Sequence, residues 1–304
     1  MPSGSRSLRA HPQAGVRAED AADARRFLLE RETVEPVHVV VPNAGDRSQA
    51  KGLVCHVWAG PNPAGSYLKL GEGVYLSSPE MTFSEMAQEL SLIELVRFGY
   101  ILCGSYACDE CSDRGFRKRV PLTSVQSLKR QVKKMESRHG VKKAARALRF
   151  IADGSASPME TILAMVLCLP RMIGGYGLDL PELNARIEAR MKGLVDRDHF
   201  LCDLYWRKQR VAVEYDSDEH HSGAEAEARD SARRSALLSH GVTVLSVRPE
   251  QFFDARKFDE TARAIAKLTG KRLPANDAGW MMKRDRLRRE LLGDLVPSGT
   301  GRKS

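Results

Sequence analysis

Residues 199–216 read HFLCDLYWRKQRVAVEYD, and this stretch decides the predicted fold. Two runs rich in β-branched and aromatic residues, 199–206 and 209–216, flank Arg207 and Lys208. Such runs around a two-residue connection predict a β-hairpin that turns at residues 207 and 208.

The elements on either side of this hairpin predict a layered α/β domain. A helix is expected over 157–169, a strand over 184–189, a helix over 224–240 and an apolar strand over 242–247. The order is therefore α-β-β-β-α-β. A strand, a crossover helix and a second strand at the end imply at least one parallel pairing.

Two acids interrupt the apolar pattern of the hairpin. Asp203 and Glu214 each lie inside strand sequence, where an unpaired carboxylate is costly to bury. A turn at 207–208 places residue 203 opposite about residue 212, with Glu214 on the same face. Carboxylate oxygens that converge in this way are suited to Mg²⁺ or Mn²⁺, although a structural pair at a strand edge is the alternative.

A histidine pair follows the hairpin. His220 and His221 come soon after Asp216. Histidine exchanges protons near neutral pH, so His220 is a candidate to orient or deprotonate an attacking water. The alternative is a pair of exposed loop residues.

These residues resemble the very-short-patch-repair (VSR) endonuclease-like domain of unknown function, a branch of the PD-(D/E)XK nuclease superfamily. The family pattern has a strand Asp, then Glu-x-Asp-Gly-x-x-His, then Asp-x-x-Arg and a Gly-x-x-Val strand. The matching residues are Asp203, Glu214, Asp216, His220, Asp230, Arg233, Gly241 and Val244. The resemblance covers roughly residues 155–250, including a helix start with Ser157, Pro158 and Glu160.

The resemblance implies a restriction-endonuclease-like core with a metal-dependent phosphodiesterase site. Asp203 and Glu214 would bind the metal, Glu160 would lie near it, and His220 matches the family histidine. Asp216 stands where many PD-(D/E)XK enzymes have a catalytic Lys, a departure shared with the VSR-like branch. Ser217 replaces the usual Gly, which puts the local turn in doubt.

Two pairs of these residues also have purely structural interpretations. Ser157 and Glu160 have the spacing of a capping box, which explains Glu160 without a metal. Asp230 and Arg233 are one helical turn apart and can form an ion pair. In the alternative, Arg233 or Arg234 contacts a phosphate.

Positive charge is concentrated in two segments. The chain has 304 residues and a net charge of +9. Residues 114–149 hold 13 Lys or Arg against one acid, and residues 256–304 hold 13 against six. This distribution predicts contact with a nucleic-acid backbone, DNA in the first instance, although solvated helix faces have the same composition. The predicted nucleic-acid contacts are Arg207, Lys208, Arg233, Arg234, Lys129 and Lys133.

The composition shifts along the chain predict five regions. They are a weakly ordered leader over 1–36, a small α+β domain over 37–113, a basic helical connector over 114–154, the nuclease-like domain over 155–272, and a basic C-terminal helix and tail over 273–304.

The N-terminal domain and the connector contain further predicted elements. Strands are expected over 37–41, 53–58 and 74–77, and helices over 79–98, 123–138 and 141–153. The N-terminal part resembles the front of bacterial proteins that carry the VSR-like domain behind an abortive-infection antitoxin-like region.

The cysteines and apolar runs predict a cytoplasmic protein. Six cysteines are too few for a disulfide scaffold, and no apolar run approaches the length of a membrane span. Cys103, Cys108 and Cys111 form the one cluster, with Cys55 and His56 as further ligands. Free thiols are favoured there over zinc, because structural zinc usually needs two clean pairs.

The sequence therefore leaves several functions open. The first is a Mg²⁺- or Mn²⁺-dependent DNA endonuclease acting in defence or repair. The second is a non-catalytic DNA-binding protein, antitoxin-like or regulatory, with a degenerate nuclease fold. The third is a protein–protein module. The DNA substrate, activity on RNA, a partner toxin and homo-oligomerisation are not determined by the sequence.

Overall fold

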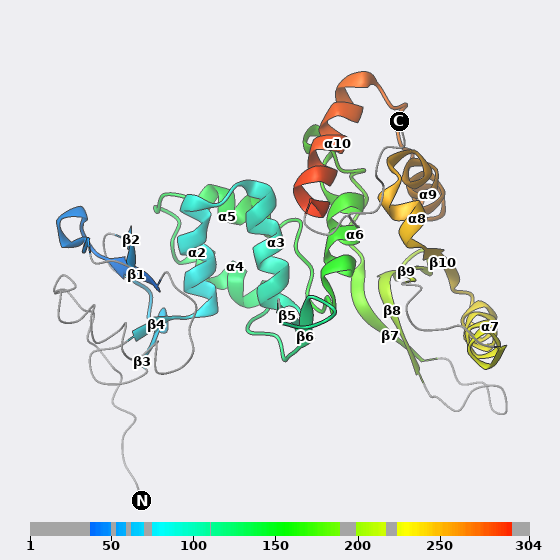
Figure 1. Ribbon diagram of the computed structural model, residues 1–304, viewed down its shortest axis with the longest axis horizontal. Helices are drawn as coiled ribbons and strands as arrows, with labels where there is room; N and C mark the ends of the chain where they lie inside the picture. Colours follow the sequence, from blue (N-terminus) through cyan, green and yellow to red (C-terminus); the bar gives the residue numbers. More distant parts are fainter. Residues whose placement is uncertain are drawn as a thin grey trace, which may run out of the picture. The chain divides into compact units, whose positions relative to one another are not determined.

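The computed structural model (Figure 1) describes residues 37–49, 53–58, 62–69, 75–109, 111–188, 199–216 and 224–293. The predicted leader over 1–36 lies outside these ranges, as does the tail after residue 293. The chain forms two compact units, one from residues 1–89 with 130–141 and the other from residues 90–129 with 142–304.

The first unit combines two small strand pairs with a helix. Its elements are β1 (Val37–Val41), η1 (Ala44–Asp46), β2 (Leu53–Val57), β3 (Tyr67–Lys69), β4 (Tyr75–Ser77) and α2 (Pro79–Glu89). Strands β1 and β2 are parallel, whereas β3 and β4 form an antiparallel pair. Met81 and Phe83 of α2 are fully buried, and Glu85 is buried beside them. Burial raises the pKa of Glu85 to about 7.

The second unit contains the predicted α/β domain. Its central sheet has the strand order β10-β9-β8-β7, with β7 (Glu182–Glu188), β8 (His199–Trp206), β9 (Val211–Tyr215) and β10 (Thr243–Val247). Strands β7, β8 and β9 are antiparallel neighbours, and β10 runs parallel to β9. The parallel pairing is possible because helix α7 (Ala224–Ser239) carries the chain from β9 to β10.

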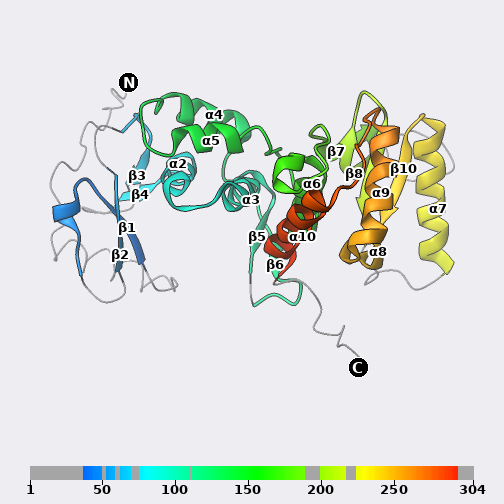
Figure 2. The same ribbon diagram turned by 90° about the horizontal axis from the view of Figure 1, so that it is seen from above.

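Helices cover both faces of this sheet (Figures 1 and 2). Helix α7 packs on one face, where its Ala236 and Leu237 join a buried cluster with Phe200 and Cys202 of β8. On the other face, α6 (Pro158–Cys168) packs on β8 and β9, and α9 (Ala255–Leu268) packs on β9. The mixed α/β class predicted from the sequence is therefore confirmed.

The remaining elements extend this unit. They are α3 (Leu92–Cys103), β5 (Tyr106–Cys108), β6 (Phe116–Lys118), η2 (Arg171–Ile173), α8 (Pro249–Phe253) and α10 (Ala278–Leu292). Helix α10 packs on α6 and η2. The basic helices α4 (Val125–Lys133) and α5 (Val141–Ala147) each contain residues of both units.

The hairpin turn was predicted incorrectly. The connection between β8 and β9 is a four-residue turn over 207–210, so that Leu204 faces Val213 and Trp206 faces Val211. Arg210 takes a positive φ of 53° and donates its backbone N–H to the Arg207 carbonyl. The alignment of β8 with β9, and with it the position of residue 203 relative to β9, therefore differs by two residues from the expected register.

The helix expected over 79–98 is two helices. Ser91 caps α3, accepting a hydrogen bond from the Glu94 backbone while the Glu94 carboxylate accepts one from the Ser91 backbone. This capping box starts a new helix inside a continuous apolar pattern. The connector helices are also shorter than expected, and Asp153 accepts a hydrogen bond from the first residue of α4, Val125.

Among the described residues, no helix combines the length and the apolar character that a membrane crossing requires.

Candidate functional site

The candidate site lies where α6, β8 and β9 meet in the second unit. Asp203 is half-buried on β8, and its Oδ2 accepts a hydrogen bond of 2.9 Å from the backbone N–H of Tyr215 on β9. A carboxylate held by an adjacent strand has a fixed position relative to that strand. Leu204 and Val213 form the β8–β9 pair that is farthest from the turn. Asp203 and Glu214 lie one position beyond this pair on their strands.

The Glu214 carboxylate is paired with an arginine of helix α7. Both terminal nitrogens of Arg233, on α7, donate to the two carboxylate oxygens of Glu214. One of these nitrogens also donates to the Leu201 carbonyl at 2.6 Å. The Glu214 and Arg233 side chains are only 14% and 29% exposed. The geometry is the bidentate arrangement in which arginine binds carboxylates most strongly.

Glu160 caps the start of α6. Ser157 accepts a hydrogen bond from the Glu160 backbone, and the Ser157 hydroxyl donates to the Glu160 carboxylate at 3.0 Å. The other carboxylate oxygen accepts from the Ala156 backbone at 2.8 Å and from Asn184 at 2.6 Å. This network differs from a standard capping box, since Ala156 replaces Ser157 as the backbone donor. The Glu160 oxygens are thus fully used in holding the helix start.

Asn184 is a residue that the sequence analysis did not single out. It has a positive φ of 46° in β7 and interrupts the pairing of β7 with β8 between Leu183 and Ala185. Its amide donates to both Glu160 and the Gly154 carbonyl. Asn tolerates a positive φ and is rare in strands. These two properties are the only indication in the sequence that Asn184 interrupts the strand.

The three acids interact electrostatically. Burial raises the pKa of Asp203 to about 7, with further contributions in the same direction from Glu160 and Glu214. The Tyr215 N–H and the Arg233 guanidinium act in the opposite direction. Burial also raises the pKa of Glu160. Glu160 and Glu214 therefore concentrate negative charge around Asp203, and such an environment favours a cation.

Comparisons with known proteins show that the chain is similar to two mycobacterial proteins. Uncharacterized protein MT2308 and Uncharacterized protein Rv2248, from two strains of Mycobacterium tuberculosis, are each 31% identical over 225 residues. The match covers 74% of this chain and 71% of each relative. The chain belongs to the family of these two proteins. No family model and no solved structure matches it.

The other predicted catalytic residues are only partly described. Asp216 directly follows β9, its backbone N–H donates to the Val247 carbonyl at 3.0 Å, and its side chain is exposed. His220, His221 and Ser217 lie outside the described residues, as does the side chain of Asp230. Arg233 pairs with Glu214, whereas its predicted pairing with Asp230 involves a side chain that lies outside the described residues.

The predicted nucleic-acid contacts lie on the β8–β9 turn, on α7 and on α4. Arg207 forms a bidentate ion pair with Glu182 across the β7–β8 edge. Lys208 and Arg234 are exposed on the turn and on α7. Lys129 and Lys133 are exposed one turn apart on α4. Arg207 and Arg233 are therefore already neutralised by acids of the same sheet.

The cysteine cluster shows free thiols. Cys103 is buried, and Cys108 and Cys111 are exposed in and after β5. Within the ranges that the structure describes, no group of three or more His, Cys, Asp or Glu side chains has the arrangement of a metal site.

Proposed function

We propose that the second unit contains a PD-(D/E)XK core and that the chain is a metal-dependent DNA endonuclease of the VSR-like branch. The topology supports this proposal, because an antiparallel β7-β8-β9 meander is followed by a crossover helix and a parallel β10. The observation that carries it is the position of Asp203 on β8, where its carboxylate accepts a hydrogen bond from Tyr215, the neighbour of Glu214 on β9, and where Glu160 of α6 and Glu214 both raise its pKa.

The donor chemistry of the site fits Mg²⁺ or Mn²⁺. Asp203 and Glu214 supply hard carboxylate oxygens on neighbouring strands, and Asp203 is destabilised as an anion where it lies. These two residues would hold the ion. A bound divalent ion would lower the pKa of a coordinated water and neutralise charge that develops on the phosphate.

The chain's own residues have separate roles in this proposal. Arg233 holds the Glu214 carboxylate in position. Glu160 fixes the start of α6 beside Asp203 and adds negative charge to the site. Asp216 lies in the position that is Lys in many relatives of the superfamily, and His220 would accept a proton from the attacking water.

A second function has specific support. Both oxygens of Glu214 are occupied by Arg233, and both oxygens of Glu160 are occupied by hydrogen-bond donors. A site stabilised in this way needs no metal, as expected for a degenerate nuclease fold in a DNA-binding antitoxin-like or regulatory protein. This alternative predicts salt-sensitive DNA binding that is unchanged by EDTA.

Cleavage of supercoiled plasmid DNA separates the two functions. The wild type is expected to nick the plasmid with Mg²⁺ or Mn²⁺ and to lose this activity in EDTA. Asp203→Asn is expected to lower the rate by at least about 100-fold, since even residues behind metal ligands cost 10- to 100-fold. Glu182→Gln makes the same chemical change at an exposed position of the sheet and should retain the wild-type rate.

The nuclease proposal is lost if neither metal supports cleavage of plasmid, mismatched or modified DNA. It is also lost if Asp203→Asn cleaves as fast as the wild type. DNA binding without cleavage would instead support the regulatory function.

A further inference from the structure

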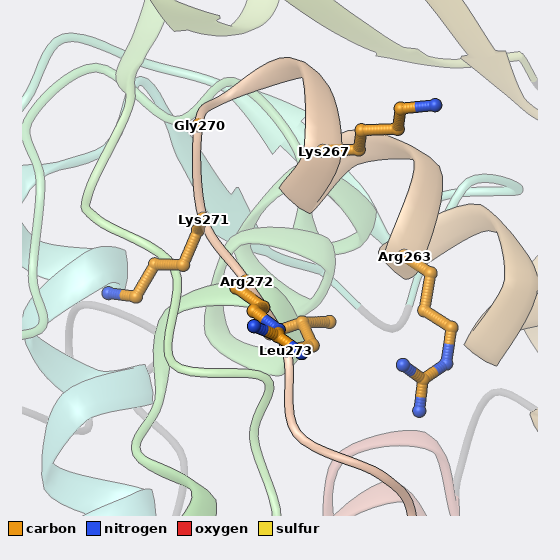
Figure 3. A pocket seen from close by; sticks show the side chains of 6 residues that line it. All are labelled: Arg263, Lys267, Gly270, Lys271, Arg272 and Leu273. Atoms are coloured by element: carbon orange, nitrogen blue, oxygen red, sulfur yellow. The ribbon is translucent and has the colours of Figure 1, made fainter.

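A groove at the C-terminal end of α9 is lined mainly by cations. It has a volume of about 390 Å³. Figure 3 shows the lining residues, which are Arg263, Lys267, Gly270, Lys271, Arg272 and Leu273. Four of the six carry a positive charge and none carries a negative charge. None of them belongs to the candidate cleavage site or to the six residues named individually as nucleic-acid contacts, although all of them lie in the basic segment 256–304.

The groove is shaped by a rigid turn. Gly270 has a positive φ of 74°, and its N–H donates to the Lys267 carbonyl at 3.2 Å. The N–H of Lys271 donates to the Ala266 carbonyl at 2.7 Å. These two bonds form a Schellman motif, which ends the helix in a defined geometry. The turn directs the chain from residue 271 onward away from the helix axis and holds Arg272 close to the last turns of α9.

The cations of the groove have different partners. Arg263 is oriented by hydrogen bonds to the Asn276 side chain at 2.7 Å and to the Pro274 carbonyl at 3.3 Å. Lys271 points to the other side of the loop from Arg263 and Lys267 and pairs with Asp179 at 3.3 Å. The side chains of Lys267 and Arg272 are exposed, and the described part of the chain offers neither side chain a hydrogen bond or ion pair.

We propose that this groove binds phosphate groups of a DNA backbone, with Lys267, Arg272 and the free N–H groups of Arg263 as the contacts. Arg263 and Lys267 are four residues apart on one helix, a spacing at which like charges repel each other. No acid in the groove relieves this repulsion, whereas an anionic ligand would. Arginine forks and lysine ammonium groups are the usual partners of phosphate oxygens. The choice of DNA as the polyanion rests on the proposed nuclease function.

The groove is far from the candidate cleavage site. Helix α9 has 14 residues, so that its ends are about 20 Å apart at 1.5 Å per residue. Its first turn follows α8, whose Phe252 contacts Tyr215, the neighbour of Glu214, with ring centroids 5.9 Å apart. The groove lies at the opposite end of α9. It therefore adds affinity for a duplex without contributing groups to the reaction.

Fluorescence anisotropy with a labelled 20-base-pair DNA duplex in EDTA tests this proposal. Lys267→Gln combined with Arg272→Gln should weaken binding by at least about 10-fold at 100 mM salt. The slope of log K against log salt should fall by about 2 in magnitude, because two phosphate contacts are lost. Arg186→Gln with Arg286→Gln removes the same charge from exposed positions of β7 and α10, and it should weaken binding less than 3-fold.

Two further measurements complete the design. Lys267→Arg with Arg272→Lys keeps the charge and should bind within 3-fold of the wild type, which separates charge from disturbance of the fold. At saturating plasmid, the double Gln variant should also cleave at the wild-type rate.

The groove is rejected if both neutralising pairs weaken binding equally, because the effect is then one of net charge. It is also rejected if the wild type does not bind the duplex, or binds an RNA duplex of the same sequence more tightly. Binding is measured without metal, so a failure of cleavage alone rejects the nuclease function and leaves the groove intact.

Discussion

At the scale of single residues, the site is dominated by one half-buried acid. Asp203 lies near two other carboxylates and accepts a hydrogen bond from the Tyr215 N–H. Because burial and the neighbouring carboxylates destabilise the Asp203 anion, either a bound cation or a proton would stabilise this side chain. In the proposed function, metal binding and stability would thus be linked through the same side chain.

The raised pKa of Asp203 predicts a pH dependence of stability. Because the folded pKa of about 7 exceeds the unfolded value of about 3.9, the folded state binds the proton more tightly. The free energy of unfolding should therefore fall as pH rises from 4 to 7, by up to about 4 kcal/mol from this group. Urea unfolding at pH 5 and pH 7.5 measures this decrease, and Asp203→Asn should reduce it.

Glu85 provides the control for this measurement. Its pKa is also raised to about 7, but it lies in the first unit. Glu85→Gln should remove a separate part of the pH dependence, and the effects of the two variants should add. An unchanged pH dependence in Asp203→Asn would show that Asp203 is ionised normally in the folded protein.

The Arg233–Glu214 pair predicts strong coupling. Arg233→Met leaves a largely buried Glu214 without its partner and should lower the free energy of unfolding by about 2 to 3 kcal/mol. Glu214→Gln in the same chain should recover most of this loss, because the unpaired charge is then gone. A double-mutant cycle measured by urea unfolding gives the coupling energy, and a value below about 0.5 kcal/mol would contradict the structure.

At the scale of secondary-structure elements, α10 is held by a buried polar network. Arg284 of α10 forms an ion pair with Asp259 of α9, and Tyr176 and Asn276 also donate to this carboxylate. The Asp259 and Arg284 side chains are 14% and 7% exposed. The network fixes α10 against α9 and the loop after η2.

Asp259→Ala should therefore destabilise the protein by about 3 kcal/mol, since it removes one of the two carboxylates paired with the buried Arg284 and leaves the Tyr176 hydroxyl and the Asn276 amide without this acceptor. The decrease in Tm measured by calorimetry checks this value. Glu260→Ala, which removes a carboxylate from the adjacent exposed position, is the control and should change stability little. Equal effects of the two substitutions would show that the network contributes nothing.

The elements also show what sequence patterns can determine. The order α-β-β-β-α-β follows from apolar periodicity and turn residues, and the structure has it. The register of the β8–β9 hairpin depends on the length of its turn. Arg207 and Lys208 do not indicate that the turn has four residues. The break between α2 and α3 depends on the hydrogen bonds of Ser91 and Glu94, which override a continuous apolar pattern.

At the scale of the whole molecule, the candidate site depends on contacts between distant segments. The sequence singled out Asp203, Glu214 and Glu160, but the partner of Arg233 and the role of Asn184 depend on the sheet. Asp230 is the nearest acid to Arg233 in sequence, and local spacing gives no indication that Glu214, which is 19 residues away, pairs with Arg233.

Titration of the chain with Mn²⁺, followed by electron paramagnetic resonance of the free ion, tests the central claim most directly. We predict that the wild type binds Mn²⁺, that Mg²⁺ displaces it, and that Asp203→Asn loses this binding while Glu182→Gln keeps it. Failure of the wild type to bind Mn²⁺, or equal binding by Asp203→Asn, would contradict a metal site at Asp203 and Glu214.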